Sequence, residues 1–362
     1  MKLFIADRPA HRSRHLGLWI LSVLVIVLVG MGFYHVYKPL PPGVDFSGPE
    51  RSATEVQFLA DRTFIKANGE RYTDQQIFDA VFDMIAGARQ FVLVDMFLFN
   101  DFQGQLTETH RPLSDELTDA LIAQKKRYPA LDIQVISDPL NTLYGGRPSP
   151  HFAQLEAADI SVTLTDLTRL RDSNPTYSAF WRLFIHPFGN SEGELLPNPF
   201  GEGRVSLRSY LAMLNFKANH RKLIIADDGT QLSALVTSAN PHDGSSAHGN
   251  VALRFNGAAA WDLFESEAAV LKFSDAPVPI PEIEQISESS SNGLTVQVIT
   301  ERSVERASLE MIDGAEPGDK LDMAMFYLSD RDIIKALKRA AERGVSLRVL
   351  LDPNKDAFGR KK

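Results

Sequence analysis

Two spacings of hydrophobic positions recur along the chain. Short apolar runs rich in β-branched residues predict buried strands, and apolar residues three and four apart predict amphipathic helices. Ile77, Val81, Met84 and Ile85 show the second spacing. The expected order is helix 74–88, strand 91–99, helix 113–128, strand 131–136, helix 149–158 and strand 160–164. Such alternation predicts an α/β domain with a central sheet.

A hairpin is predicted after these elements. Residues 218–226 end in an apolar run and predict a strand, Asp227-Asp228-Gly229 is turn chemistry, and residues 231–238 predict the return strand. A polar loop then leads into a further strand and a helix, and a Pro-, Ser- and Glu-rich stretch without periodicity predicts a linker. These segments are 251–255, 258–271 and 274–293.

The hairpin carries the most informative polar residues. Side chains two apart on a strand share a face, so His220 and Lys222 are expected to point the same way. Ser238 and Asn240 would share a face at the end of the return strand. An imidazole can attack phosphorus, while an ammonium, a hydroxyl and an amide stabilise charge on the phosphate oxygens. The four residues therefore suit phosphoryl chemistry.

At these positions the chain resembles the phospholipase D superfamily. His220-x-Lys222-x4-Asp227 is its HxKx4D motif, and Ser238-x-Asn240 matches the Ser and Asn that follow in the family. The sequence departs from the pattern twice: Thr237 stands where the family usually has Gly, and the gap between Asp227 and Ser238 is longer. The alternative is a structural histidine beside a surface lysine, with a chance match.

The resemblance implies phosphodiester chemistry through a phosphohistidine, without metal or cofactor. It assigns His220, Lys222 and Asp227 to catalysis, with Asp227 either orienting the site or serving only as a turn residue. It assigns Lys222, Ser238 and Asn240 to holding the substrate phosphate. His248 and Asn250, in the polar loop that edges the site in the family, either contact substrate or reflect ordinary loop polarity.

The chain also contains an internal repeat. Residues 83–88 and 96–101 (DMIAGA, MFLFND) have counterparts at 310–315 and 325–330 (EMIDGA, MFYLSD), and the strand before Asp138-Pro139 has its counterpart before Asp352-Pro353. Only ten residues follow Asp352, too few for a second His-x-Lys motif. The family usually builds its site from two motifs. We therefore expect a two-motif protein cut short, or a chain that completes its site as a homodimer.

Residues 16–37 lack Lys, Arg, Asp and Glu and are long enough to cross a bilayer as one helix. Trp19, Tyr34 and Tyr37 lie toward its ends, as interfacial aromatics do. Basic residues precede it, which predicts a cytoplasmic N-terminus and an extracytoplasmic remainder at the inner membrane. A cleaved signal peptide is the alternative, but the apolar stretch is long and no small-x-small cleavage pattern follows it.

Composition narrows the function classes. The 362 residues include no cysteine, which excludes disulfides, a cysteine nucleophile and zinc–thiolate sites. The formal net charge of -8 disfavours general nucleic-acid binding. One segment is locally basic: residues 166–222 hold eight Lys and Arg against five Asp and Glu. It could attract an anionic head group, or it is a solvated surface of mixed charge.

An aromatic stripe precedes the motif. Its spacing of 3, 1, 3 and 4 predicts one helical face, formed by Tyr177, Phe180, Trp181, Phe184 and Phe188. A core-facing helix is the simpler interpretation. The alternative is a lip that dips into the membrane interface and admits lipid.

Together these features predict an α/β protein: a phospholipase D-like repeat with a mixed central sheet flanked by helices, the start of a second repeat, and one transmembrane helix. The expected segments are a basic cytoplasmic tail 1–15, an anchor 16–37, a spacer and domain entry 38–73, the first repeat 74–273, a linker 274–294 and the beginning of the second repeat 295–362. The expected function is phospholipid hydrolysis or phosphatidyl transfer, as in a cardiolipin synthase. A nuclease of the superfamily and a remnant with little activity are the alternatives.

Overall fold

The computed structural model describes residues 10–53, 55–103, 110–283 and 293–352. Residues 1–9 of the predicted basic tail and residues 284–292 of the predicted linker lie outside these ranges. The chain divides into two compact units. The first comprises residues 1–42 and 50–296, and the second comprises residues 43–49 and 297–362.

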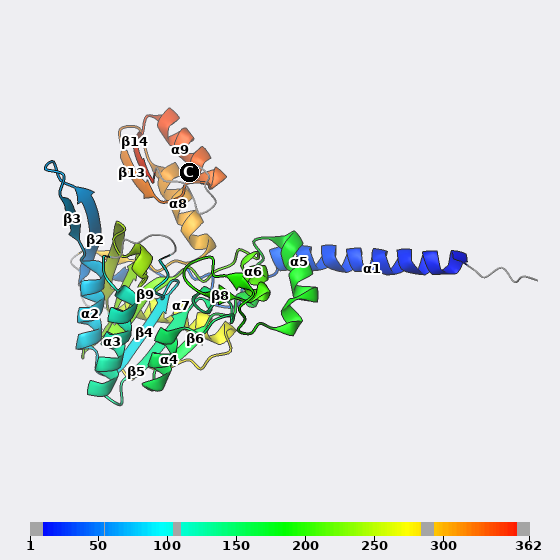
Figure 1. The fold of residues 1–362 in the computed structure, drawn as a ribbon. Helices are drawn as coiled ribbons and strands as arrows, with labels where there is room; N and C mark the ends of the chain where they lie inside the picture. The colour runs from blue at the N-terminus through cyan, green and yellow to red at the C-terminus, as the bar shows by residue number, and fades with distance from the viewer. Residues whose placement is uncertain (1–9, 54, 104–109, 284–292, 353–362) are drawn as a thin grey trace, which may run out of the picture. The chain divides into compact units, whose positions relative to one another are not determined.

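An eight-stranded mixed sheet organises the first unit (Figure 1). Its order is β3-β2-β11-β10-β9-β4-β5-β6, in which β4, β5 and β6 run parallel and the remaining neighbours pair antiparallel. The strands are β2 (Val56–Ile65), β3 (Arg71–Asp74), β4 (Phe91–Met96), β5 (Asp132–Ser137), β6 (Ser161–Leu164), β9 (Lys222–Asp227), β10 (Leu232–Thr237) and β11 (Asn250–Asn256). The predicted mixed α/β sheet is confirmed.

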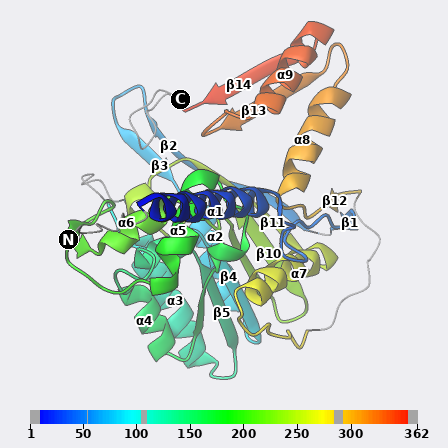
Figure 2. The same cartoon turned by 90° about the vertical axis from the view of Figure 1, so that its right-hand side faces the viewer.

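Helices cover both faces of this sheet. The helices α2 (Ile77–Gly87), α3 (Leu113–Arg127) and α4 (Pro150–Ala157) bury their apolar faces against one side of β4, β5 and β9. Side chains alternate between faces along a strand. The alternate positions of β4 and β9 therefore face α7 (Ala258–Phe273), whose Phe264 packs edge-on against Phe91. Figure 2 shows β4 and β5 side by side in the middle of the unit.

The first unit begins with α1 (Ala10–Tyr37), whose residues 15–37 are long and apolar enough to cross a membrane. Signal sequences share this length and composition. The last turns of α1 lie beside α5 (Pro175–Phe184), in both ribbon views (Figures 1 and 2). The short helix α6 (Leu207–Met213) and the two-stranded ladder of β7 (Leu196–Pro197) with β8 (Arg204–Val205) follow α5.

The second unit has the same order of elements as the start of the first. It runs α8 (Arg302–Gly314), β13 (Lys320–Met325), α9 (Arg331–Arg343) and β14 (Ser346–Leu351), with β13 and β14 parallel. Asp330 caps α9 by accepting hydrogen bonds from two backbone N–H groups, and Gly344 ends it in the left-handed conformation, which glycine adopts without strain. The sequence repeat is thus also a repeat of helix, strand, helix, strand.

Two segments differ from expectation. Residues 38–73, predicted as a spacer, contribute β2 and β3 to the sheet, and a further short ladder joins β1 (Arg51–Ser52) to β12 (Thr295–Val296). The strand predicted over residues 218–226 begins only at Lys222. His220 therefore lies on the segment that leads into β9, at the sheet edge where the parallel strand β4 ends.

Candidate active site

The structure brings His220 and Lys222 into direct contact. Nζ of Lys222 lies 3.0 Å from Nδ1 of the imidazole and donates a hydrogen bond to the carbonyl oxygen of His220 at 2.8 Å. Lys222 is 6% exposed, whereas the His220 side chain reaches solvent. The imidazole is therefore accessible to a substrate, and the ammonium lies behind it.

The ring of Phe97 packs against both side chains, and these three residues are called the His220 corner below. The ring centroid of Phe97 lies 4.5 Å from that of His220, and Nζ of Lys222 lies 5.1 Å from the centre of the same ring. Its backbone N–H donates to the carbonyl oxygen of Arg221 at 3.0 Å, extending the pairing of β4 with β9 by one residue. An aromatic face attracts a cation, so Phe97 helps to hold both functional side chains. Sequence analysis placed Phe97 in a strand and did not identify this role.

Burial and neighbouring charge keep His220 neutral. Desolvation and the positive charge of Lys222 lower the pKa of the imidazole to about 4. Desolvation also lowers the pKa of Lys222 to about 8, against the attraction of Asp95. At neutral pH the corner thus contains an uncharged imidazole beside a predominantly charged amine.

Asp227 lies at the opposite end of β9 from Lys222. Its buried carboxylate accepts hydrogen bonds of 2.9 to 3.2 Å from the backbone N–H groups of Arg89, Gln90 and Phe91. These groups lie between α2 and the start of β4, whereas Lys222 pairs with Met96 at the other end of β4. The contacts of Asp227 are therefore those of a structural residue that fixes the start of β4.

The two neutral donors, Asn240 and Ser238, make different hydrogen bonds. Oδ1 of Asn240 accepts a 3.0 Å hydrogen bond from the backbone N–H of Leu98, beside Phe97, which leaves the amide N–H groups of Asn240 to donate elsewhere. Oγ of Ser238 instead donates to Oδ1 of Asn250 at 2.9 Å and accepts from the N–H of Val251. Within the described ranges, neither side chain hydrogen-bonds to His220 or Lys222.

One family model matches part of the chain. Residues 308–362 match the family described as "Cardiolipin synthase, PLD-like domain". This segment is therefore similar to a phospholipase D-like domain. The match falls in the second unit, which has the helix, strand, helix, strand order of the first. It does not include His220 or Lys222, so the roles of these two residues stay predictions.

Solved structures similar to this chain are remote. Nuc from Salmonella typhimurium, a phospholipase D family member, is 15% identical, with 56% of this chain and 83% of that chain covered and a TM-score of 0.27. Phosphatidylserine synthase from Haemophilus influenzae Rd KW20 is 11% identical, with 84% and 64% covered and a TM-score of 0.46. This chain thus spans less than two thirds of that synthase. No curated protein sequence matches the chain.

A buried polar cluster supports the segment that leads into β9. Nδ2 of Asn219 donates to both carboxylate oxygens of Asp95, at 3.0 and 2.8 Å, and its backbone N–H donates to Asp138 at 2.7 Å. Burial, and then the charge of Glu267, raise the pKa of Asp95 well above its usual value. The guanidinium of Arg221 meets Glu267 at 2.6 Å. The second carboxylate oxygen of Glu267 is buried and has no hydrogen-bond partner among the described residues.

This cluster fixes the backbone on both sides of His220, because Asn219 and Arg221 are its neighbours in the chain. Sequence analysis missed Asp95 and Glu267. One signal was available: Asp95 interrupts the apolar run Phe91-Val-Leu-Val, where a carboxyl group must find partners inside the protein. In the neighbouring loop, Asn250 contacts Ser238 and also donates to the carbonyl oxygen of His248 at 3.2 Å. Among the described residues, no group of three or more metal-binding side chains comes together.

Proposed function

We propose that the chain is a phospholipase D-type phosphodiesterase or phosphatidyltransferase that acts on membrane phospholipids through a phosphohistidine at His220. The contact of 3.0 Å between Nζ of Lys222 and Nδ1 of His220, at the exposed sheet edge, is the observation that carries this proposal. It pairs a neutral nucleophile with the cation that a phosphate needs.

The contact also implies an order of events. An ammonium only donates, so Nδ1 is the acceptor and the proton of the neutral imidazole resides on Nε2. Attack by Nε2 requires that proton to move to Nδ1, which requires Lys222 to leave Nδ1. A substrate phosphate supplies a stronger acceptor for Lys222. Substrate binding would thus draw Lys222 onto the phosphate and release the imidazole for attack.

The proposed reaction has two steps. His220 forms an N–P bond while the bond from phosphorus to the leaving-group oxygen breaks, and that oxygen takes a proton from an acid outside the His220 corner. A second motif, or a second copy of the chain, would provide that acid. Water then attacks the phosphohistidine to give hydrolysis, or an alcohol attacks it to give phosphatidyl transfer. The Lys222 ammonium and the Asn240 amide would hold the phosphate oxygens in both steps.

We further propose that α1 anchors the chain in the inner membrane with an extracytoplasmic domain. The apolar span of α1 and the basic residues that precede it in the sequence support this topology. An anchored enzyme shares one surface with phospholipids, so its substrate would not have to leave the bilayer.

A nuclease is the second candidate, favoured by the basic segment 166–222. The structure weakens that support, because four of these eight cations have carboxylate partners. Arg182 and Lys217 both bind Asp172, at 2.7 and 2.8 Å, and Arg221 binds Glu267. Arg169 contacts Asp166 and Asp275. The segment therefore offers few uncompensated charges for a nucleic-acid backbone.

Substrate competition tests the proposal. The full chain, reconstituted in vesicles of phosphatidylethanolamine and phosphatidylglycerol, is expected to release or exchange lipid head groups and to leave single-stranded DNA intact. His220→Ala should abolish the lipid reaction, and His110→Ala, at an exposed histidine without a proposed role, is the matched control. Release of acid-soluble nucleotides without any lipid turnover would favour the nuclease instead.

A further inference from the structure

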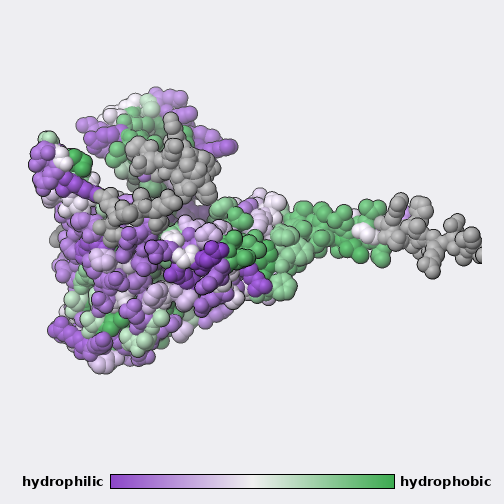
Figure 3. Space-filling view, in the orientation of Figure 1, coloured by the Kyte–Doolittle hydropathy of each residue, from purple (hydrophilic) through white to green (hydrophobic). Residues whose placement is uncertain are grey.

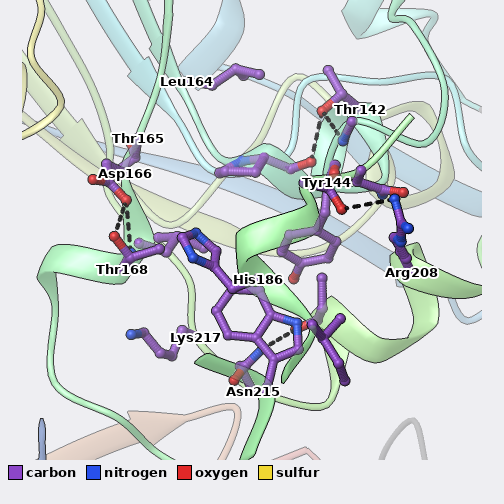
Figure 4. A pocket seen from close by; sticks show the side chains of 18 residues that line it. Thr142, Tyr144, Leu164, Thr165, Asp166, Thr168, His186, Arg208, Asn215 and Lys217 are labelled. Atoms are coloured by element: carbon purple, nitrogen blue, oxygen red, sulfur yellow. Dashed lines mark hydrogen bonds between the residues drawn. The ribbon is translucent and has the colours of Figure 1, made fainter. Parts of the chain in front are cut away.

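A cavity of about 300 Å³ lies next to the segment that carries His220, at the same edge of the sheet (Figure 4). Its walls come from the loops that follow β5 and β6 and from α5 and α6, and they are predominantly apolar. The apolar lining residues are Pro139, Leu164, Leu167, Trp181, Ile185 and Ala212. This volume is at the small end of the range for ligand sites.

The cavity lies beside the segment that leads to His220. Thr165 lines it, and Oγ1 of Thr165 accepts a 3.0 Å hydrogen bond from Asn219, the residue before His220. Pro139, another lining residue, follows Asp138, which accepts the backbone N–H of Asn219. A ligand in the cavity would therefore lie next to the segment that carries the proposed nucleophile.

The loop that follows β6 also connects the cavity to the end of α1. Lys38, the first residue after α1, donates from Nζ to the carbonyl oxygen of the lining residue Thr168 at 3.0 Å. The N–H of Asp172 donates to the carbonyl oxygen of His35 at 3.0 Å. A Cβ on Gly32 would lie 3.4 Å from the carbonyl oxygen of Pro175, so α1 and α5 approach closely there. The cavity thus lies at the end of the apolar span.

One residue of the aromatic stripe lines the cavity, and others are exposed at the surface. Trp181 lines the cavity, whereas Phe180 and Phe184 are 46% and 41% exposed and contact each other at 5.0 Å between ring centroids. Phe188 is 69% exposed. The buried residues of α5 are Ser178 and Ala179. The prediction of a core-facing stripe is therefore wrong for these phenylalanines, because small residues make the close contact with the rest of the unit.

Other exposed apolar side chains occur in the residues that follow α5. They are Leu195, Phe200, Leu207, Leu214 and Phe216. Figure 3 shows hydrophobic residues at the base of α1, continuous with the hydrophobic surface of that helix. Large exposed aromatic and aliphatic side chains next to an apolar span are typical of a surface in contact with the membrane interface.

We infer that the cavity binds one acyl chain of a phospholipid from the bilayer that holds α1, and that α5 presents Phe180 and Phe184 to the same bilayer. The inference rests on the membrane anchoring proposed above and adds the part of the substrate that the protein would recognise. An acyl chain that passes from the bilayer into an apolar cavity stays out of water, so its insertion can hold the lipid beside the segment that carries His220 without exposing apolar surface.

Photolabelling tests this directly. The full chain is placed in nanodiscs that contain phosphatidylethanolamine with a diazirine at the end of one acyl chain, and the labelled peptides are mapped by mass spectrometry. Label is expected on the lining residues of α5 and α6 as well as on α1. Ala212→Phe, which fills the cavity, should reduce the α5 and α6 label at least fivefold. Ala153→Phe adds the same bulk on the exposed face of α4 and should leave the label unchanged.

The possible results separate the two proposals. Equal labelling in Ala212→Phe and the native chain, or label confined to α1, would overturn the acyl-chain site even if the enzyme turns over lipid. Persistent cavity labelling in a chain without lipid turnover would leave the site intact and count against the proposed activity. His220→Ala should keep the full label, since it removes chemistry and not the cavity. Ile185→Trp provides a second filling variant should Ala212→Phe fail to fold.

Discussion

At the scale of single residues, the corner made by His220, Lys222 and Phe97 explains how a neutral nucleophile and a cation coexist. The sequence predicted the pairing of His220 with Lys222 from their spacing of two, although the reason given was a strand that begins only at Lys222. Contacts with residues distant in sequence, such as Phe97 and Asp95, could not be read from local spacing. They depend on the register of β4 with β9.

The first prediction concerns the protonation of His220. Its lowered pKa of about 4 keeps the imidazole neutral as the pH falls from 7.5 to 5, whereas an ordinary histidine with a pKa of about 6.5 becomes charged. Diethylpyrocarbonate modifies neutral imidazole, so the rate at His220, followed by peptide mapping, should fall by less than about a third over this range. The modification rate of a free imidazole should fall about thirtyfold over the same range. Lys222→Met should move the pKa of His220 upward, because one cause of its depression is removed.

The second prediction separates structure from catalysis at Asp227. Asp227→Ala leaves the three backbone N–H groups of residues 89–91 without their acceptor, which should cost about 3 kcal/mol. The midpoint of thermal unfolding should therefore fall well below that of Asp228→Ala, a control in the exposed turn. A variant that keeps its unfolding midpoint but loses lipid turnover would show that Asp227 acts in catalysis after all.

At the scale of elements, apolar periodicity predicted β4, β5, β6, α3, α4 and α7 to within a few residues, because all of them except β6 bury apolar side chains. It missed β2 and β3, whose exposed residues, Phe64 and Tyr72 among them, weaken the alternation of an edge pair. Periodicity also could not show whether the aromatic stripe of α5 faces the core or the surface. Periodicity identifies a face of a helix, but what that face meets depends on the packing of α1 against α5.

The third prediction tests that packing. Gly32→Leu places bulk against Pro175 and Ala179, whereas Gly30 has no atom near its Cβ position and provides the matched control. In nanodiscs, backbone hydrogen exchange in residues 175–184 should accelerate at least about fivefold in Gly32→Leu, which corresponds to roughly 1 kcal/mol of lost local stability. Equal exchange in Gly32→Leu and Gly30→Leu would show that α1 does not hold α5.

At the scale of the whole molecule, two units share one order of elements, and the family match to the second unit supports the phospholipase D-like assignment. The sequence revealed this repeat because the two strand ends, Asp138-Pro139 and Asp352-Pro353, are nearly the same. It could not reveal how the first unit places its cavity at the end of α1, since this depends on contacts between residues more than 100 positions apart, such as Lys38 with Thr168.

The fourth prediction concerns topology, and the absence of native cysteine makes it simple to measure. In intact cells, a membrane-impermeant maleimide should label Ser191→Cys, in the first unit, and should leave Ser13→Cys unlabelled until the cells are opened. The positive charges before the apolar span are the physical reason for this orientation. Labelling of Ser13→Cys alone would show that the chain has the opposite orientation in the membrane.

The most direct measurement is the capture of the covalent intermediate. The full chain in vesicles, quenched during turnover of phospholipid labelled at the phosphate, should carry an acid-labile, alkali-stable phosphoryl group that maps to His220. The label should disappear in His220→Ala and remain in His110→Ala. Persistence of the label in His220→Ala, or its attachment to another residue, would contradict the proposed role of the His220 and Lys222 pair.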